Sequence, residues 1–171
     1  MNRRNLIVAG VVAGCVIALR GTIGQAQDAR VQKSMASLKA MTAQLGAAKI
    51  EGREAVAGKD APTLYFGSTK INNNFDIVDA IGKEAGSGMT ATLFVRNGDE
   101  YIRVSTSVPK PDGSGRAIGT VLAGPALESI KAGQPHYGEV PILGTPYVTG
   151  YEPIKDASGA IIGVYYVGYK K

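Results

Sequence analysis

Hydrophobic positions along the chain follow three different spacings in turn. Residues 6–19 form an uninterrupted apolar run, LIVAGVVAGCVIAL. From residue 28 apolar residues recur every three or four positions, as on one face of a helix. Beyond residue 89 short segments alternate between apolar and polar side chains, as strands do. The order predicts an N-terminal leader or anchor, a long helix and then a sheet.

The helical spacing predicts one amphipathic helix over residues 27–52, with Asp28 as its N-cap. Its apolar stripe can pack on the chain's own sheet, or pair with a second copy or a membrane receptor as a short coiled coil. Residues 51–62 show no apolar period and are expected to form a connector. The stripe consists of Val31, Met35, Leu38, Met41 and Leu45.

About five antiparallel strands are predicted in the second half of the chain. Asn97-Gly98 is a strong hairpin signal between the first two. Short helices are expected at residues 75–81 and 126–131. The pattern therefore predicts an α+β fold, a long N-terminal helix packed on a single antiparallel sheet. The expected strands are residues 89–96, 100–108, 137–143, 146–155 and 160–169.

The first 26 residues resemble an export signal, since a basic start precedes a short apolar core and small residues. Cleavage before Gln27, a twin-arginine signal at Arg3-Arg4, and an uncleaved anchor through residues 6–19 all fit this pattern. A lipobox ending at Cys15, which would then carry a lipid, is a further alternative. Every one of these alternatives places the folded part in the periplasm or otherwise outside the cytoplasm.

Composition excludes several function classes. The formal net charge is +5, but beyond residue 26 the chain has 16 basic and 14 acidic residues, so no nucleic-acid footprint remains. One Cys and one His leave no disulfide and no His/Cys metal site. A catalytic triad would depend on His136 alone. We therefore expect no enzyme activity and no cofactor.

Residues 63–169 resemble a known family in segment order and spacing. The matching segments include LYFGSTKINNNFDIVDAI, MTATLFVRNG, IRVSTSV, KPDGSGRAIGT, YGEVPILGTPYVTGYEPIKDASG and IIGVYYVG. The stretch is similar to the single Cache extracytoplasmic sensor domains of the Cache 3/Cache 2 fusion type. The resemblance implies a PAS-like fold that binds small molecules, often short organic acids, as in chemoreceptors and sensor histidine kinases.

Receptors of this family carry a second membrane helix and an output domain after the last strand, and we expect neither in this protein. The expected function is thus an exported or membrane-tethered sensing module that feeds signal transduction through a partner. The alternative is a ligand-free interaction module that dimerises or docks through the helix stripe.

A carboxylate ligand needs a cation and several N–H or O–H donors in a concave site. Arg103 lies in mid-strand, and the alternation predicts that it shares a polar face with Ser105, which could equally be solvated. Arg116 could clamp a ligand, or bind loop carbonyls and Asp112. Core tyrosines are common, so the three tyrosines have a packing alternative. The candidate ligand-binding residues are Arg103, Ser105, Arg116, Tyr137, Tyr147 and Tyr151.

Overall fold

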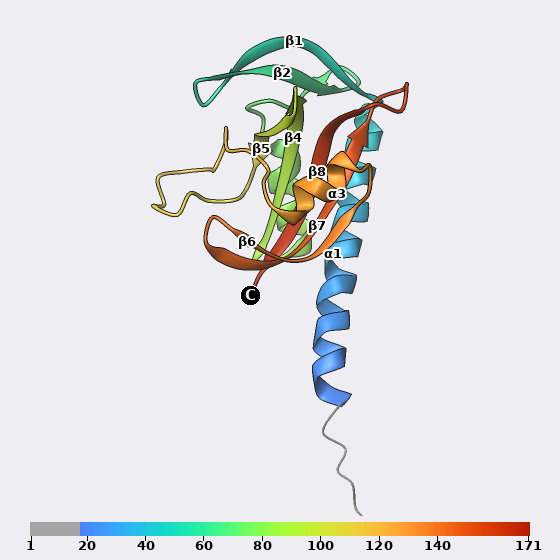
Figure 1. Cartoon of the computed structure of the whole chain (residues 1–171), viewed down its shortest axis with the longest axis vertical. Helices are drawn as coiled ribbons and strands as arrows, with labels where there is room; N and C mark the ends of the chain where they lie inside the picture. Colours follow the sequence, from blue (N-terminus) through green and yellow to red (C-terminus); the bar gives the residue numbers. More distant parts are fainter. Residues whose placement is uncertain (1–17) are drawn as a thin grey trace, which may run out of the picture.

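The computed structural model of the chain describes residues 18–171, in three helices and eight strands (Figure 1). Cys15, the twin arginines and most of the predicted apolar leader lie outside the described residues. The elements are α1 (Ala18–Leu45), β1 (Ala48–Val56), β2 (Lys59–Phe66), β3 (Thr69–Lys70), α2 (Asp76–Ala85), β4 (Met89–Asn97), β5 (Glu100–Thr106), α3 (Pro125–Lys131), β6 (His136–Ile142), β7 (Thr145–Lys155) and β8 (Ile161–Lys170).

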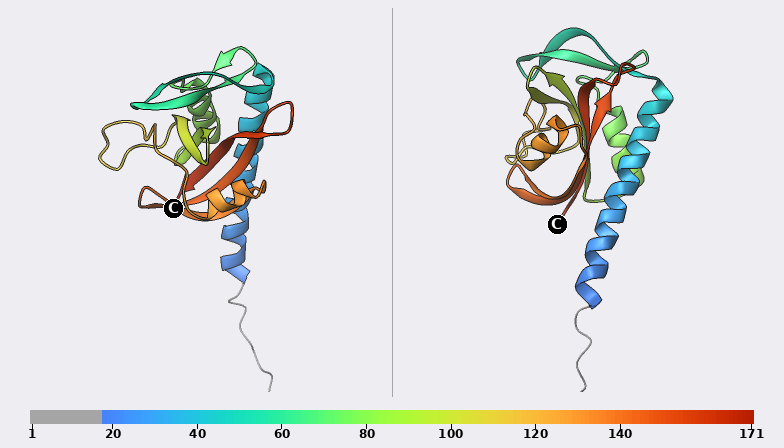
Figure 2. Two further views of the ribbon diagram at one scale, coloured as in Figure 1. Left: turned by 45° about the horizontal axis from the view of Figure 1, so that its top comes forward. Right: turned by 45° about the vertical axis from the view of Figure 1, so that its right-hand side comes forward.

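The long helix exists, but both of its predicted ends were wrong. The described part of α1 already includes Ala18, so Asp28 lies within the helix and is not its N-cap. It ends at Leu45 instead of residue 52, because Gly46 adopts a φ of +119°, a conformation that stops a helix. The first turns of α1 extend beyond the body of the domain (Figure 2).

The predicted connector at residues 51–62 was also wrong, since β1 and β2 form a hairpin there. They pair antiparallel from Ala48↔Phe66 to Val56↔Lys59, and β3 adds a short third strand. Within β1 only the two end residues are buried. Without an alternating apolar face, the strand carries no period that a sequence pattern could reveal.

The five-stranded sheet confirms the predicted α+β class. Its strand order is β5-β4-β8-β7-β6, and every neighbouring pair is antiparallel. Helices α2 and α3 lie where the two short helices were expected. The order places β5 and β6 at opposite edges of the sheet, and the β1–β2 hairpin arches over one end of it (Figure 1).

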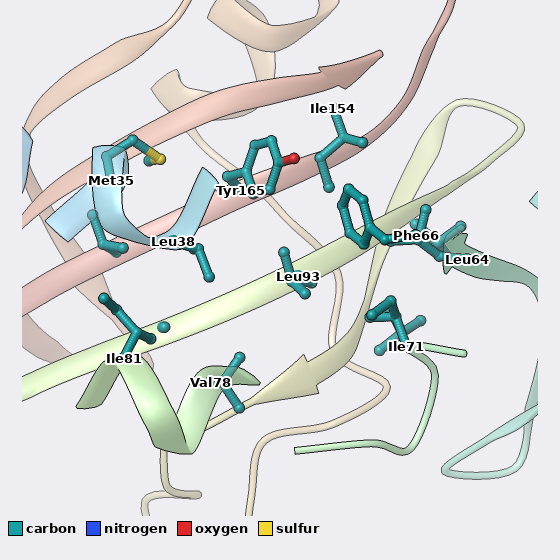
Figure 3. Close-up of a cluster of buried hydrophobic side chains, with 14 of the residues drawn as sticks. Met35, Leu38, Leu64, Phe66, Ile71, Val78, Ile81, Leu93, Ile154 and Tyr165 are labelled. Atoms are coloured by element: carbon teal, nitrogen blue, oxygen red, sulfur yellow. The ribbon is translucent and has the colours of Figure 1, made fainter. Parts of the chain in front are cut away.

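One face of this sheet packs against α1 and α2. Side chains from both helices, β2, β4 and β8 meet in a single apolar cluster (Figure 3). Val31, Met35 and Leu38 are at most 1% exposed in this cluster. These three residues of the stripe therefore belong to the core and offer no surface to a partner. For them the expected pairing with a second copy or a receptor is wrong. Met41 packs against the cluster and Leu45 is 36% exposed.

The other face of the sheet is covered by the segment between β5 and α3, by α3 itself, and by the curl of the β6–β7 hairpin. A second apolar cluster fills this side, with Phe94, Tyr151 and Tyr166 at its centre. Because loops form much of this cover, it is the side on which a small cavity remains.

Candidate ligand-binding site

The segment after β5 folds back and binds along the edge of that strand. The backbone N–H of Arg103 donates to the Thr120 carbonyl, and the Gly119 N–H donates to the Arg103 carbonyl, both at 2.8 Å. Leu122 N–H donates to the Tyr101 carbonyl at 2.9 Å. We call residues 116–123 the edge loop. It satisfies the backbone of β5 much as a further strand would, and so fixes the position of Arg103.

The Arg103 side chain is buried, with the residue only 5% exposed. Its Nη1 donates to Thr120 Oγ1 at 2.8 Å, and its guanidinium carbon lies 5.1 Å from the centre of the Phe94 ring. Its Nε is buried and has no hydrogen-bond partner within residues 18–171. No carboxylate of the described residues forms an ion pair with it.

Burial lowers the pKa of Arg103, since desolvation disfavours the charged form. The guanidinium nevertheless stays protonated, because its unperturbed pKa is far above neutrality. A buried cation normally has an anionic partner, and this one has none in the described part of the chain.

A cavity of about 150 Å³ opens beside this guanidinium. Tyr151 contributes from β7, and burial raises the pKa of its hydroxyl, so the group remains a protonated donor. Two exposed apolar side chains are among the lining residues, Val121 on the edge loop and Leu143 in the β6–β7 turn. The lining residues are Arg103, Thr120, Val121, Leu122, Ala123, Val140, Pro141, Ile142, Leu143 and Tyr151.

Two of the predicted site residues thus line one cavity, Arg103 and Tyr151. Tyr147 shares the face of Tyr151, as its spacing predicts, and is buried in the same apolar cluster. It does not line the cavity and contributes to the packing behind it.

Ser105 lies on the opposite face of the sheet from Arg103. Arg103 is paired with Phe94 and Ser105 with Leu93, so Val104 is an extra residue in β5 and forms a bulge. The bulge reverses the alternation, which makes the predicted common face wrong. Ser105 Oγ donates to the Asn74 carbonyl at 2.6 Å on the side of α2.

Tyr137 also faces away from the cavity, toward α1. Its ring and Val31 both lie against Gly150, where an added methyl group would come within 2.6 Å and 2.9 Å of them. Its hydroxyl donates to Glu152 Oε1 at 2.5 Å, and Lys39 Nζ binds the other oxygen at 2.6 Å. Tyr137, Lys39 and Glu152 line an open hollow of about 490 Å³ beside α1.

Arg116 holds the start of the edge loop against α2. Its Nη1 and Nη2 bind the two carboxylate oxygens of Asp79 at 2.7 Å and 2.9 Å. Nη1 also donates to the Thr106 carbonyl at 2.8 Å, and the guanidinium lies over the Phe75 ring. The carboxylate that it binds is thus Asp79, not Asp112, and belongs to the chain itself. Arg116 borders a separate open hollow of about 570 Å³.

Sequence reasoning missed the cavity walls from the edge loop and from β6. Thr120 closes the segment RAIGT, so the resemblance did mark this stretch, but it gave no reason to place a hydroxyl beside Arg103. Nothing in the described residues gathers three His, Cys, Asp or Glu side chains into a possible metal site.

The family model of the Cache 3/Cache 2 fusion domain matches residues 12–171. The chain belongs to this family, whose members are extracytoplasmic modules that sense or bind small molecules. A search of curated proteins gives no match. Across residues 18–171, no helix has both the length and the apolar character that crossing a bilayer would take.

Proposed function

We propose that this protein binds a small carboxylate in the cavity beside Arg103. The buried guanidinium, which has no anionic partner among the described residues, is the observation that carries the proposal. A ligand carboxylate would accept hydrogen bonds from the guanidinium N–H groups that face the cavity, and would supply the missing negative charge. Charge-assisted hydrogen bonds of this kind are among the stronger ones in proteins.

The cavity limits the size of that ligand. About 150 Å³ corresponds to roughly five water molecules at the volume that water has in the liquid. Arg103 is the one charged side chain among the lining residues, and the Tyr151 hydroxyl adds a neutral donor. This composition favours a short monocarboxylate whose apolar end contacts Val140 and Ile142.

We further propose that the domain works outside the cytoplasm, either exported or tethered to the membrane by the apolar segment at residues 6–19. When it binds ligand, it signals this to a partner protein. Helix α1 supports this proposal, because it packs on the sheet and leads from the domain toward that segment. Burial of Val31, Met35 and Leu38 argues against the ligand-free alternative based on that stripe.

Thermal unfolding of the full-length protein tests the ligand. Sodium acetate, propionate and butyrate are compared with acetamide, propionamide and butyramide, at equal ionic strength set with sodium chloride. A ligand present at 100 times its Kd stabilises the folded state by about 2.7 kcal/mol, a shift of several degrees. We expect the acids to raise the Tm and the amides to leave it unchanged.

Two variants locate the effect. Arg103→Met should lose the shift, while Arg96→Met, which removes an exposed arginine from β4, should keep it. Equal shifts with acids and amides, or an undiminished shift in Arg103→Met, would overturn the proposal.

A further inference from the structure

The tip of the β1–β2 hairpin rests directly on the edge loop. A methyl group added to Gly119 would lie 2.7 Å from the Ala57 Cβ and 3.2 Å from the Val56 carbonyl oxygen. Real Cβ atoms essentially never come as close as 2.7 Å, so the Gly119 backbone meets the Ala57 methyl group with no space for a side chain between them. Gly119 directly precedes Thr120, the residue that holds Arg103. The cavity wall at Thr120 is therefore one residue away from the contact with the hairpin tip.

The other end of the same hairpin is fastened to the end of α1. The Gly67 N–H donates to the Ala47 carbonyl at 2.9 Å. A methyl group on Gly67 would overlap the carbonyl oxygen of Leu45, the last residue of α1, and one on Gly46 would lie 2.9 Å from the Gly67 Cα. The hairpin therefore makes a close contact at each end, with no room for an added side chain at either.

Between these contacts the hairpin is a continuous two-stranded ribbon. Figure 1 shows it crossing the end of the sheet from α1 toward the segment that follows β5. The ladder of pairs runs from Ala48↔Phe66 to Val56↔Lys59, with one irregularity between Ile50 and Arg53. A paired ribbon transmits a tilt at its tip to its base more directly than a single flexible strand would.

We propose that the β1–β2 hairpin couples the cavity beside Arg103 to the C-terminal end of α1. A change at Thr120 moves Gly119 against Ala57, and the ribbon carries that movement to Gly67 and Leu45. The coupling is reciprocal, so a partner that shifts α1 changes the affinity of the cavity. The inference rests on the proposed function only for what enters the cavity, and its test uses no ligand.

Hydrogen exchange of the Gly67 amide, measured by NMR on the full-length protein, reports on the far end of this route. Thr120→Val keeps the shape of the side chain and removes its hydrogen bonds to Arg103 and Ala117. We expect it to change the Gly67 exchange rate by about twofold to thirtyfold, the range of such couplings. Thr120→Ser keeps the hydroxyl, so the Gly67 amide should exchange at the wild-type rate in this variant.

A second substitution tests the contact itself. Ala57→Gly removes the methyl group that touches Gly119, and glycine accepts the φ of +49° found there. In this background Thr120→Val should change Gly67 exchange by less than about twofold, the lower end of the coupling range. Tyr151→Phe alters the cavity from the side of β7. It should leave the exchange rate of the Gly67 amide unchanged and serves as the matched control.

The proposal is overturned if Thr120→Val alters exchange only at residue 103 and in the edge loop, or if its effect at Gly67 persists undiminished in Ala57→Gly. If no carboxylate raised the Tm in the thermal screen, the proposed ligand would be refuted. The proposed coupling would still stand, since the exchange measurements on these variants use no ligand.

Discussion

The guanidinium of Arg103 and the hydroxyl of Thr120 are joined by a 2.8 Å hydrogen bond that links the edge strand of the sheet to the loop covering it. The same hydroxyl donates to the Ala117 carbonyl, also at 2.8 Å. Thr120 therefore uses its donor and one acceptor position within the protein, and Arg103 is held in one orientation. The proposed carboxylate would bind the guanidinium N–H groups that face the cavity, and the edge loop would then have a direct part in the proposed site.

Arg103 is predicted to lower the stability of the ligand-free protein. Arg103→Met should leave the free energy of unfolding unchanged or raise it by up to about 2 kcal/mol, because an apolar side chain of similar length avoids burying an unpaired charge. Urea unfolding without added carboxylate measures this. A loss of more than about 2 kcal/mol would mean that Arg103 is a structural residue.

Residues of the helix stripe are predicted to contribute unequally to the free energy of unfolding. Leu38→Ala should lower the free energy of unfolding by about 2–5 kcal/mol, since Leu38 is fully buried between α1 and the sheet. Leu45→Ala, with the leucine 36% exposed, is the matched control and should cost less than about 1 kcal/mol. Urea unfolding of both variants tests the packing, and equal losses would contradict it.

Arg116 is predicted to act through Asp79 and not through the ligand. Both side chains are more than a third exposed, so Arg116→Ala should lower the free energy of unfolding by only about 0.2–1 kcal/mol. A double-mutant cycle with Asp79→Ala should show that the two substitutions are not additive. Carboxylate affinity should stay within about twofold of the wild type, and a hundredfold loss would place Arg116 in the site instead.

Acid is predicted to loosen the contact between α1 and β7. Burial by itself would raise the pKa of Glu152, but hydrogen bonds from Lys39 and Tyr137 outweigh it, and the net pKa is lowered. A carboxyl with a lowered folded-state pKa contributes stability that is present above its unfolded pKa, near 4.5, and is lost as the pH falls through the folded pKa.

Thermal unfolding measured between neutral pH and pH 3 tests this contribution. The Tm of Glu152→Gln should fall less steeply below the ordinary glutamate pKa of 4.5 than that of the wild type. Glu100→Gln removes an exposed carboxylate that forms no ion pair within the described chain and should retain the wild-type slope. Identical slopes in all three proteins would show that Glu152 contributes nothing.

Elements with a clear apolar period could be predicted from the sequence. The stripe from Val31 to Leu38 does face the core, and the Asn97-Gly98 turn does join two paired strands. Strand β1 could not be predicted, because most of its middle residues are exposed, four of them are charged, and its partner lies across a turn at Ala57 and Gly58. The structure of β1 is determined by its pairing with β2 and not by burial of its side chains.

The candidate site was predicted only in part, for a similar reason. Arg103 was singled out because a charge in an apolar strand is costly, and the structure does bury it, although its role as a ligand-binding residue stays a prediction. The bulge at Val104 turns Ser105 to the other face, and one inserted residue leaves no trace in the local pattern. Partners such as Asp79 for Arg116 depend on how distant segments meet, which spacing along the chain does not encode.

The Arg103 Nε–Hε signal in a ¹H–¹⁵N NMR spectrum tests the central claim most directly, with assignment made by its loss in Arg103→Met. In the wild type this N–H is buried and has no hydrogen-bond partner in the described part of the chain. Titration with sodium acetate should shift the signal saturably, and acetamide at the same concentrations should leave it in place. A signal that stays unmoved while acetate raises the Tm would place the carboxylate elsewhere and contradict the account.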